Sequence, residues 1–388
     1  MRSTVTVICI WLVSLGAAAQ FGKFAVLFDR VAAAYPGQAA PMIGLIVSTV
    51  GFAGLIFGTT AGIFISSLGY RRVVIIALVA GATVSAVEAL MPPVPVMLVL
   101  RALEGVSHLA LVVSAPVLTA QLASPRWQAA AMTLYSSFFA VSFAVLGYVG
   151  PRLADMAGLP AVYLAHGGYL LAGAAVMALL LPADKRAPMP RLGARSLMAS
   201  HVQIYSNPRE AAPAFGFVCY TATFVAFLTL MPQQFLGRPE QVILATYMPL
   251  VSVLASLTLG VWGLGRVSAV RMVQLGFAAS LVFVALLWLA WGQATATVLA
   301  AFGVAGALGL VQSASFAAIP QLNPDPAARA RAAGAIAQLG NVGTTLGTPI
   351  LVWLIAQAGV TGLAVFLGVF GCIGIAVHSQ QARRRLTC

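Results

Sequence analysis

Long apolar stretches separated by short polar turns make up most of the chain. A bilayer core requires about 20 mostly apolar residues for each helical crossing, and by this measure the sequence predicts twelve spans. These are residues 5–28, 42–66, 73–91, 96–121, 128–151, 159–181, 212–236, 241–263, 271–292, 295–319, 332–357 and 360–378. The stretches lack the alternation of apolar and polar residues that is typical of membrane barrel strands. We therefore predict an all-α membrane protein with twelve transmembrane helices.

The first span has two interpretations. Arg2, an apolar stretch and three alanines at 17–19 are together typical of a secretory signal with its cleavage site. The apolar stretch continues past that site to Phe28, and its removal would leave eleven spans. We therefore predict that the first span is retained.

The composition limits the classes of function. Of the 388 residues, 61% are apolar and 7% are charged, whereas soluble domains carry roughly 25% charged residues. This excludes a soluble enzyme and a nucleic-acid-binding module, despite a formal net charge of +13. The four cysteines form neither a CxxC pair nor a Cys/His cluster with zinc spacing, so we predict no metal site and no disulfide framework.

The sequence also lacks the motifs of ATP hydrolysis and of common enzymatic chemistry. It contains no GxxxxGK[ST] phosphate loop, no HExxH and no GxSxG. We therefore predict a protein that is not an enzyme and has no cofactor. Its transport would be driven by gradients of ions or solutes.

The placement of the basic residues predicts the orientation in the membrane. With the N-terminus inside, three cations fall in outer segments, namely Arg30, Arg152 and Arg238. Sixteen fall in cytoplasmic segments: Arg2, Arg71, Arg72, Arg126, Lys185, Arg186, Arg191, Arg195, Arg209, Arg266, Arg271, Arg329, Arg331 and Arg383 to Arg385. This bias predicts a multi-pass protein of the inner membrane with both termini in the cytoplasm. The high net charge is then a topology signal.

A long polar stretch divides the chain into two similar halves. We expect an N-terminal six-helix bundle at 1–181, a cytoplasmic linker at 182–211 and a C-terminal six-helix bundle at 212–388. The halves resemble each other at an offset of 200 residues, as in the pair Arg71 and Arg271. Repeats of six helices in the same orientation are typical of transporters whose site lies between the halves near the bilayer midplane.

The loop between the second and third spans carries a specific motif. Residues 62–72 read GIFISSLGYRR, which is similar to the Gly-x-x-x-Asp-Arg/Lys-x-Gly-Arg-Arg/Lys loop of the major facilitator superfamily. Gly62 and Gly69 match, and Arg71 and Arg72 match after a shift of one place. Ser66 stands where the family has its acidic residue. We predict that Gly62, Gly69, Arg71 and Arg72 form a cytoplasmic gating loop.

Two further segments carry the same resemblance. Residues 101–105 read RALEG, similar to the Arg-x-x-x-Gly signature of helix 4, and residues 147–151 read GYVGP, similar to the start of the family's antiporter motif. Residues 152–154 (RLA) replace the glycines that usually follow, so the resemblance to exporters is incomplete. The resemblance implies two pseudo-symmetric bundles that transport a solute by alternating access.

The preference for Ala and Arg over Ile and Lys indicates a GC-rich bacterial genome.

Ionisable residues inside the spans are the first candidates for function, because a charge at the bilayer centre costs about 2.5–3.5 kcal/mol. We expect all of them in the N-terminal half: Lys23, Glu88, Arg101, Glu104, His108 and His166. Arg101, Glu104 and His108 share one helix face. Gly105 lies on the same face and lets a neighbouring helix or a substrate approach closely. We predict that this face carries the coupling proton, and that Lys23 and Arg101 attract an anionic solute. The alternatives are a structural ion pair with a neutral His108, and a Lys23 that extends to the outer headgroups.

The resemblance ranks Glu88 and His166 lower. In the superfamily the third and sixth helices lie at the periphery, and these two residues fall on them. Glu88 is also only four residues before Pro92, within reach of the interface.

Neutral polar residues replace the charges in the second half. We predict that Gln312, Gln338 and Asn341, together with Gln20 in the first span, line the cavity, because amides seldom face lipid. Gln338, Asn341 and Thr345 share a helix face, and Gly340, Gly343 and Gly347 lie on the same helix. Helix packing by these small residues and hydroxyl groups is the alternative explanation.

The sequence therefore predicts a secondary transporter that moves a small organic solute, for which an anion is one candidate, with a proton as coupling ion. Its other partner is the lipid bilayer, it binds no nucleic acid, and we expect a monomer. An uncoupled facilitator, a drug or metabolite efflux antiporter, and a non-transporting membrane assembly or sensor protein are the alternatives.

Overall fold

The computed structural model describes residues 2–387 except 125–130, 133, 136 and 184–193. Within these residues it contains ten helical segments long and apolar enough to cross a membrane. Two of the ten are much longer than one crossing requires, at 43 and 59 residues. The all-helical prediction is confirmed, and the count of twelve crossings stays a prediction.

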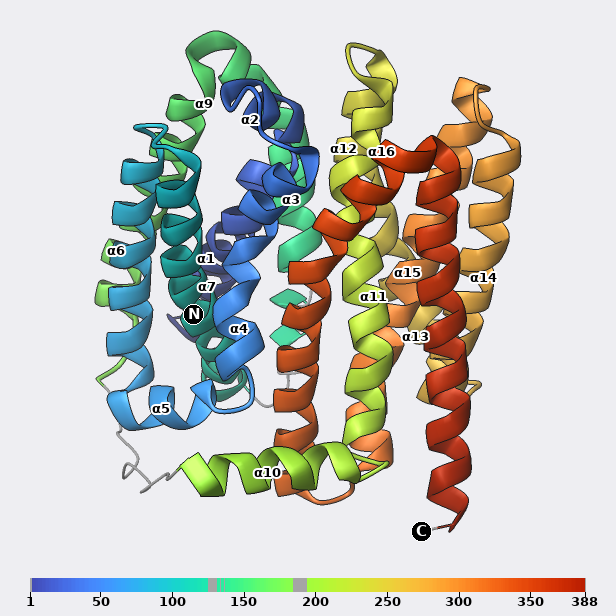
Figure 1. The fold of residues 1–388 in the computed structure, drawn as a ribbon. Helices are drawn as coiled ribbons and strands as arrows, with labels where there is room; N and C mark the ends of the chain where they lie inside the picture. The colour runs from blue at the N-terminus through green and yellow to red at the C-terminus, as the bar shows by residue number, and fades with distance from the viewer. Residues whose placement is uncertain (1, 125–130, 133, 136, 184–193, 388) are drawn as a thin grey trace.

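The two long segments each reverse direction at a glycine. The helical backbone is interrupted in α9 at Gly158 (φ 78°) and in α16 at Gly359 (φ 56°). Glycine adopts positive φ without the steric cost that a Cβ brings. Figure 1 shows both helices turning back at the top of the molecule. The breaks lie between the predicted spans 128–151 and 159–181, and between 332–357 and 360–378.

The first half of the chain lies on one side of the molecule, on the left in Figure 1. Its elements are α1 (Arg2–Ala25), α2 (Phe28–Ala34), α3 (Ala40–Ser48), the 3-10 turn η1 (Thr49–Gly51), α4 (Phe52–Phe57), α5 (Ala61–Leu68), α6 (Tyr70–Glu88), α7 (Val94–Leu122) and α9 (Phe138–Leu180). Helix α1 packs against α7 and α9, and α6 packs against the same two helices. These contacts make α1 a central helix of the first half.

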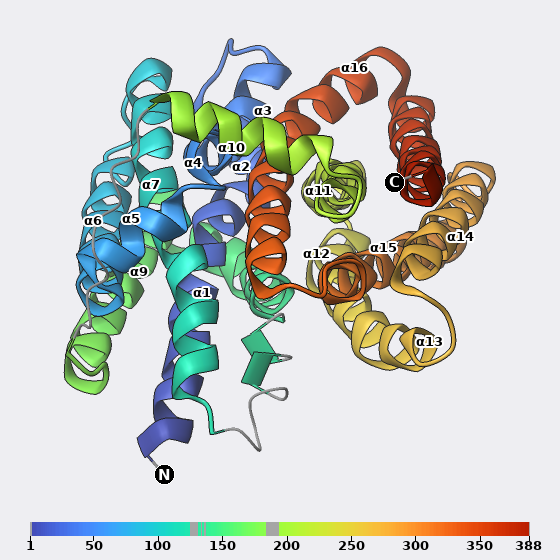
Figure 2. The ribbon, with the colours of Figure 1, turned by 90° about the horizontal axis from the view of Figure 1, so that it is seen from below.

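The second half lies on the other side. Its elements are α11 (Ala211–Leu230), η3 (Pro232–Phe235), α12 (Pro239–Ala255), the π-helical turn η4 (Ser256–Gly260), α13 (Val261–Leu264), α14 (Ala269–Leu289), α15 (Ala294–Leu322) and α16 (Pro326–Thr387). Between the halves in the sequence, α10 (Ala194–Ser206) runs across one end of the molecule (Figure 1 and Figure 2). We call this end the α10 side, and α16 also ends there. The residues Arg126, Lys185, Arg186 and Arg191 lie outside the described part of the chain.

The second predicted span is too long at its end. We predicted a helix over 42–66, but the membrane-crossing segment ends at Phe57. A turn at 58–60 follows, and α5 then runs sideways along the α10 side. The apolar residues of α5 extended the hydrophobic pattern past the true end, since Phe64 and Leu68 are exposed on this surface helix.

The two halves meet along α3, α4 and α16. A Cβ at Gly44 would lie 3.0 Å from the Cα of Pro349, and one at Gly58 would lie 2.7 Å from the Cα of Gln338. Because the chain numbers rise on one side and fall on the other, the two helices run antiparallel. We call this surface the glycine interface: Gly44, Gly51, Gly54 and Gly58 against Gln338, Asn341, Thr345 and Pro349. A second close approach joins α9 to α12, where a Cβ at Gly147 would lie 2.5 Å from the carbonyl oxygen of Ala245.

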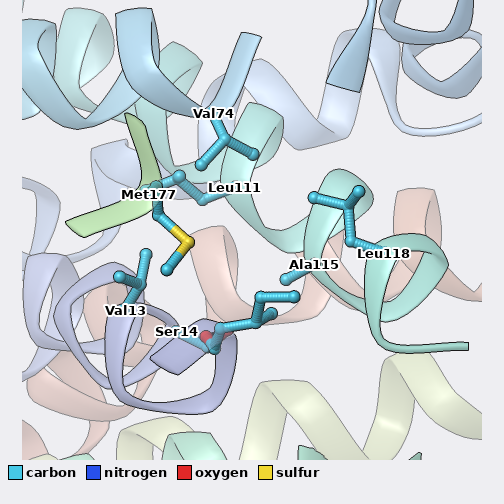
Figure 3. Close-up of a pocket in the computed structure, with 8 residues that line it drawn as sticks. Val13, Ser14, Val74, Leu111, Ala115, Leu118 and Met177 are labelled. Atoms are coloured by element: carbon cyan, nitrogen blue, oxygen red, sulfur yellow. The ribbon is translucent and has the colours of Figure 1, made fainter. Parts of the chain in front are cut away.

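A small cavity lies inside the first half, between α1, α6, α7 and α9 (Figure 3). Apolar side chains such as Val13, Leu111 and Met177 line it. Ser14 also lines it, but its hydroxyl donates to the carbonyl of Ile10 at 2.8 Å. None of the described side chains that line this cavity offers a free polar group, so the cavity is poorly suited to bind a polar solute.

Candidate functional site

Four charged side chains from three helices meet inside the first half. Lys23 comes from α1, Glu88 from α6, and Arg101 and Glu104 from α7. None of the four has any exposed surface. We call them the charge cluster. Because a buried charge is costly unless it is paired and hydrogen-bonded, the number of partners decides what this site can do.

Helix periodicity brings each helix's contribution to one face. Residues three apart on a helix lie on the same side, and α6 contributes Ser85 and Glu88 while α7 contributes Arg101 and Glu104. The second arm of α9 contributes His166 in the same way, one turn after Tyr163. Lys23 stands two residues before the end of α1, where a cation interacts favourably with the helix dipole. The next helix, α2, lies at the end of the molecule opposite α10 (Figure 1). The end of α1 that carries Lys23 therefore places the cluster near the side opposite α10.

Lys23 is surrounded by hydrogen-bond acceptors. Its Nζ lies 2.5 Å from Glu88 Oε2, 2.7 Å from Glu104 Oε1 and 2.7 Å from Ser85 Oγ. These three acceptors take the three protons of the ammonium group. The ring of Phe24 lies 5.5 Å from Nζ and adds a cation–π contact. Each of the three protons of the ammonium group thus has a protein acceptor.

Arg101 joins the cluster to α3. Its Nε donates to the carbonyl of Ile46 at 2.9 Å and its Nη2 to the carbonyl of Val47 at 3.1 Å. These carbonyls belong to the last turn of α3, where a helix leaves its carbonyl groups without intrahelical partners. Nη1 donates to Glu104 Oε2 and lies 3.6 Å from Glu88 Oε1. Arg101 therefore holds both the carboxylate pair and a helix of the glycine interface.

Close packing of α7 allows this arrangement. A Cβ at Gly105 would clash with the carbonyl oxygen of Val50 in η1. The missing side chain lets η1 approach α7, which brings the carbonyls of Ile46 and Val47 to Arg101. The prediction that Gly105 permits a close approach is confirmed.

The cluster has two cations and two carboxylates, so its net charge is zero when both carboxylates are ionised. We predicted that Lys23 and Arg101 line a watery cavity between the halves. In this structure they lie within the first half instead, and each cation already has carboxylate partners. The physical reason is that an unpaired cation would be too costly at a fully buried site.

Two residues that the sequence ranked low belong to the site. Glu88 forms a direct ion pair with Lys23 at 2.5 Å. His166 lies 3.3 Å from the same ammonium group and 4.0 Å from Glu104 Oε1. Their peripheral helices do not prevent this, because the side chains face inward and both are buried. A lone carboxylate in a long apolar helix was the sequence signal for Glu88.

The other predicted residues of the first half lie apart from the cluster. His108 is buried, and its Nδ1 lies 2.8 Å from the carbonyl of Ala17 rather than near a carboxylate. Gln20 donates from Nε2 to Ser107 Oγ at 3.1 Å, and the Ser107 hydroxyl donates to the carbonyl of Ala77. Both side chains join α1 to α7.

The residues of the predicted gating loop lie on the α10 side of the first half. Gly62 is on α5, Gly69 joins α5 to α6, and Arg71 and Arg72 are in the first turn of α6. Arg71 Nη2 donates to the carbonyl of Ala178 in α9 at 2.8 Å. This bond connects helices of the same half. The gating role of the loop stays a prediction.

In the second half, Gln338 is the predicted residue with the most contacts to other elements. Its Nε2 donates to the carbonyl of Leu55 in α4 at 3.0 Å, and its Oε1 accepts from Tyr205 Oη in α10 at 2.7 Å. His201 Nε2 lies 3.3 Å from Gln338 Nε2 and 3.0 Å from Thr59 Oγ1. We call these five residues the Gln338 junction. It connects both halves and the linker helix at the α10 end of the glycine interface.

Asn341 and Gln312 differ in their placement. Asn341 covers Gly54 in the glycine interface and donates to the carbonyl of Ala337 at 2.7 Å. Gln312 lies partly exposed on α15. A cavity role for these two residues stays a prediction.

Replacing Tyr205 with phenylalanine is expected to weaken the Gln338 junction. Burial raises the pKa of Tyr205 to about 12, so its hydroxyl stays protonated and keeps donating until the pH rises to that value. The variant leaves Gln338 Oε1 without this donor, which we expect to lower the free energy of unfolding by about 1 kcal/mol. Denaturation of the purified protein measures this. Replacement of the exposed Tyr247 with phenylalanine is the control, and equal stability of both variants would contradict the assignment.

One ionisable residue contradicts the expected asymmetry between the halves. We expected every intramembrane ionisable group in the first half, but His378 in α16 has no exposed surface. Neither ring nitrogen has a hydrogen-bond partner, and the ring packs against Gly216 of α11. The residue falls at the last position of a predicted span, so its burial depended on how the final helix packs.

No three His, Cys, Asp or Glu side chains are placed to hold a metal ion within the described ranges.

The sequence profile of the Major Facilitator Superfamily matches residues 8–348. The chain belongs to the Major Facilitator Superfamily. No curated protein matches it at a significant level.

Solved superfamily structures share its fold. A bacterial homologue of the human lysosomal transporter Spinster, inward-facing and unoccupied, is 12% identical with a TM-score of 0.75, and the alignment covers 100% of this chain and 98% of that one. A D-xylose–proton symporter is 13% identical with a TM-score of 0.75, covering 98% and 97%. The inward-open xylose transporter XylE from E. coli is 11% identical with a TM-score of 0.73, covering 98% and 95%. The family match and the shared fold support a secondary transporter.

Proposed function

We propose that the chain moves a small organic anion by alternating access, and that a proton carried by Glu104 is the coupling ion. The observation that supports this is the fully buried, neutral charge cluster, in which Glu104 contacts both cations. Adding one proton to Glu104 gives the cluster a net positive charge. An anionic group of the solute restores neutrality by binding Lys23 and Arg101.

Proton and solute then bind together, since each lowers the electrostatic cost of the other. Glu104 is better placed for this than Glu88, because it accepts a hydrogen bond from both cations, whereas Glu88 accepts one from Lys23 and lies 3.6 Å from Arg101 Nη1. Protonation of Glu88 would leave Arg101 paired with Glu104. A proton on Glu104 weakens the hold on Lys23 and Arg101 at the same time.

Arg101 provides a physical connection from the cluster to the contact between the halves. Its bonds to Ile46 and Val47 hold α3, and α3 packs against α16 through Gly44 and Pro349. A change in the charge around Arg101 therefore acts on a helix of the glycine interface. This is how protonation would bias the opening and closing of the two halves.

We also propose that the protein lies in the bacterial inner membrane with the α10 side in the cytoplasm. The basis is the bias of basic residues toward that side. Arg71, Arg72 and Arg331 are examples among the described residues, and the charge cluster then faces the outer side.

Replacement of Glu104 with glutamine tests the coupling. A thermal-shift screen of organic acids at two pH values first selects a solute. Proteoliposomes with an enclosed pH-sensitive dye then report proton movement when that solute is added. We expect the wild type to move protons with the solute, and the E104Q variant to exchange labelled solute without moving protons.

The matched control is replacement of Glu210 with glutamine. Glu210 is also buried and accepts two hydrogen bonds from Arg331, at 2.7 and 2.8 Å, but it lies outside the charge cluster. This variant should keep coupled transport. Solute-driven proton movement that persists in E104Q would refute the role of Glu104.

A further inference from the structure

His166 is held in a single tautomer by its two neighbours. Its Nε2 lies 3.0 Å from the carbonyl of Gly16, which only accepts hydrogen bonds. Nε2 therefore carries the proton. In the neutral ring, Nδ1 is then an acceptor, and it faces the Ser85 hydroxyl at 2.8 Å and Lys23 Nζ at 3.3 Å. A proton on Nδ1 would point at the ammonium group, so the charged ring is disfavoured.

The ammonium group of Lys23 consequently has four neighbouring acceptors for its three protons. The ammonium group has three protons, and Glu88, Glu104 and Ser85 take them at 2.5–2.7 Å. The Ser85 hydroxyl accepts from Lys23 and donates to His166 Nδ1. His166 Nδ1 is thus the fourth acceptor, longer at 3.3 Å, and while both carboxylates are ionised its single lone pair accepts from the Ser85 hydroxyl.

We propose that His166 is the reserve acceptor for Lys23: when Glu104 becomes protonated, Nδ1 accepts a hydrogen bond from Lys23 in place of the one from the Ser85 hydroxyl. A protonated carboxyl group is a weaker acceptor than a carboxylate, so the bond from Lys23 to Glu104 weakens on protonation. Lys23 then shifts toward Nδ1, which lies 3.3 Å from Nζ and 4.0 Å from Glu104 Oε1. His166 acts through Lys23 and is a positioning residue. This inference rests on the proposed role of Glu104.

Among the described residues, no other titratable side chain that faces Lys23 is free to take this part. The titratable and charged side chains that face Lys23 are Glu88 from α6, Arg101 and Glu104 from α7, and His166 and Tyr163 from α9. Glu88 already accepts from Lys23, and Arg101 has no acceptor atom. Tyr163 presents its ring to Lys23, 5.5 Å from Nζ.

Two substitutions of His166 separate its two bonds. In H166N the side-chain oxygen occupies the place of Nδ1, so the acceptor for Lys23 is kept and the donor to Gly16 is lost. In H166Q the amide nitrogen occupies the place of Nε2, so the donor to Gly16 is kept and the acceptor is lost. A purely structural role, holding α9 to α1, would make H166N the more disturbed variant. The reserve-acceptor role makes it H166Q.

His108 supplies a matched control. It is also buried and binds an α1 carbonyl, that of Ala17 at 2.8 Å, but it does not face Lys23. The variant H108Q therefore tests what a lost buried imidazole does without a lost acceptor.

The experiment is a pH titration of the purified full-length protein by infrared difference spectroscopy, without solute. The carboxylic C=O band that E104Q removes reports the protonation of Glu104. We expect the midpoint of this band to fall by about one pH unit in H166Q, a tenfold loss of proton affinity. H166N and H108Q should keep the wild-type midpoint.

The outcomes distinguish this inference from the proposed function. If the wild type shows no titrating band that E104Q removes, the coupling role of Glu104 fails. If the band is present but H166Q titrates as the wild type does, or H166N shifts more than H166Q, the reserve-acceptor role alone is wrong. Thermal unfolding of each variant confirms that the compared proteins are folded.

Discussion

Replacing Arg101 with methionine is expected to destabilise the folded protein by about 3–5 kcal/mol. The substitution leaves two buried carboxylates with a single cation, since Glu88 and Glu104 then share Lys23 alone. It also removes the donors to the carbonyls of Ile46 and Val47. Methionine fills a similar volume, so the loss reports charge rather than an empty space. Chemical denaturation of the purified protein in detergent measures it.

A second substitution tests whether charge is the cause. R101M combined with E104Q restores a neutral cluster of Lys23 and Glu88, and we expect the double variant to be more stable than R101M alone. Such non-additivity is typical of residues in one ion-pair network. Replacement of Arg30 with methionine is the control, because its pair with Asp155 is largely exposed and is expected to contribute at most about 1 kcal/mol. Additive losses in the double variant would show that the cluster is not one electrostatic unit.

The sequence predicted the class of fold because the signal is local. Each span is a continuous apolar stretch, and lipid leaves few structures that satisfy the backbone. The reversals at Gly158 and Gly359 fall between predicted spans for the same reason. The end of the second span was wrong because α5 is an apolar surface helix, and hydropathy alone does not distinguish a buried apolar residue from an exposed one.

The candidate site was predicted in part: contacts within one helix were predicted, and contacts between helices were not. Arg101 and Glu104 are three residues apart on one helix, so their pairing follows from periodicity. The partners of Lys23 lie 62, 65, 81 and 143 residues away along the chain. Their meeting depends on how α1 packs against α6, α7 and α9, which no periodicity contains. Glu88 and His166 were ranked low because the resemblance places their helices at the periphery, and nothing in the helix periodicity indicated that their side chains meet Lys23.

The interface between the halves shows a similar limit. Gln338, Asn341 and Thr345 were expected to share a helix face, and all three lie at the glycine interface. The glycines of α16 were expected to serve helix packing, and Gly343 and Gly347 do pack against α11. The glycines of α3 and α4 were not recognised, because their importance depends on a partner almost 300 residues away.

Replacing Gly58 with alanine is expected to separate the two halves at their α10 end. The new Cβ would lie 2.7 Å from the Cα and 2.8 Å from the backbone nitrogen of Gln338. A backbone clash cannot be relieved by rotating a side chain, so α4 and α16 must move apart. The same movement lengthens the bond from Gln338 to Leu55 and disrupts the Gln338 junction. Overpacking of this kind costs about 1–3 kcal/mol. Here it destabilises the arrangement in which the two halves are in contact at the α10 end.

Labelling of a cysteine at position 344 measures this opening. Thr344 lies in the interface, where a Cβ at Gly51 would be 3.1 Å from its hydroxyl. In a background without native cysteines, we expect T344C to react with a membrane-impermeant maleimide about tenfold faster when Gly58 is alanine, equivalent to about 1.4 kcal/mol. Replacement of Gly368 with alanine is the control, since no atom lies within 4 Å of its Cβ position. Equal labelling rates in the two alanine variants would show that the glycine interface does not limit opening, whereas a selective increase in G58A would identify it as the contact that transport must break.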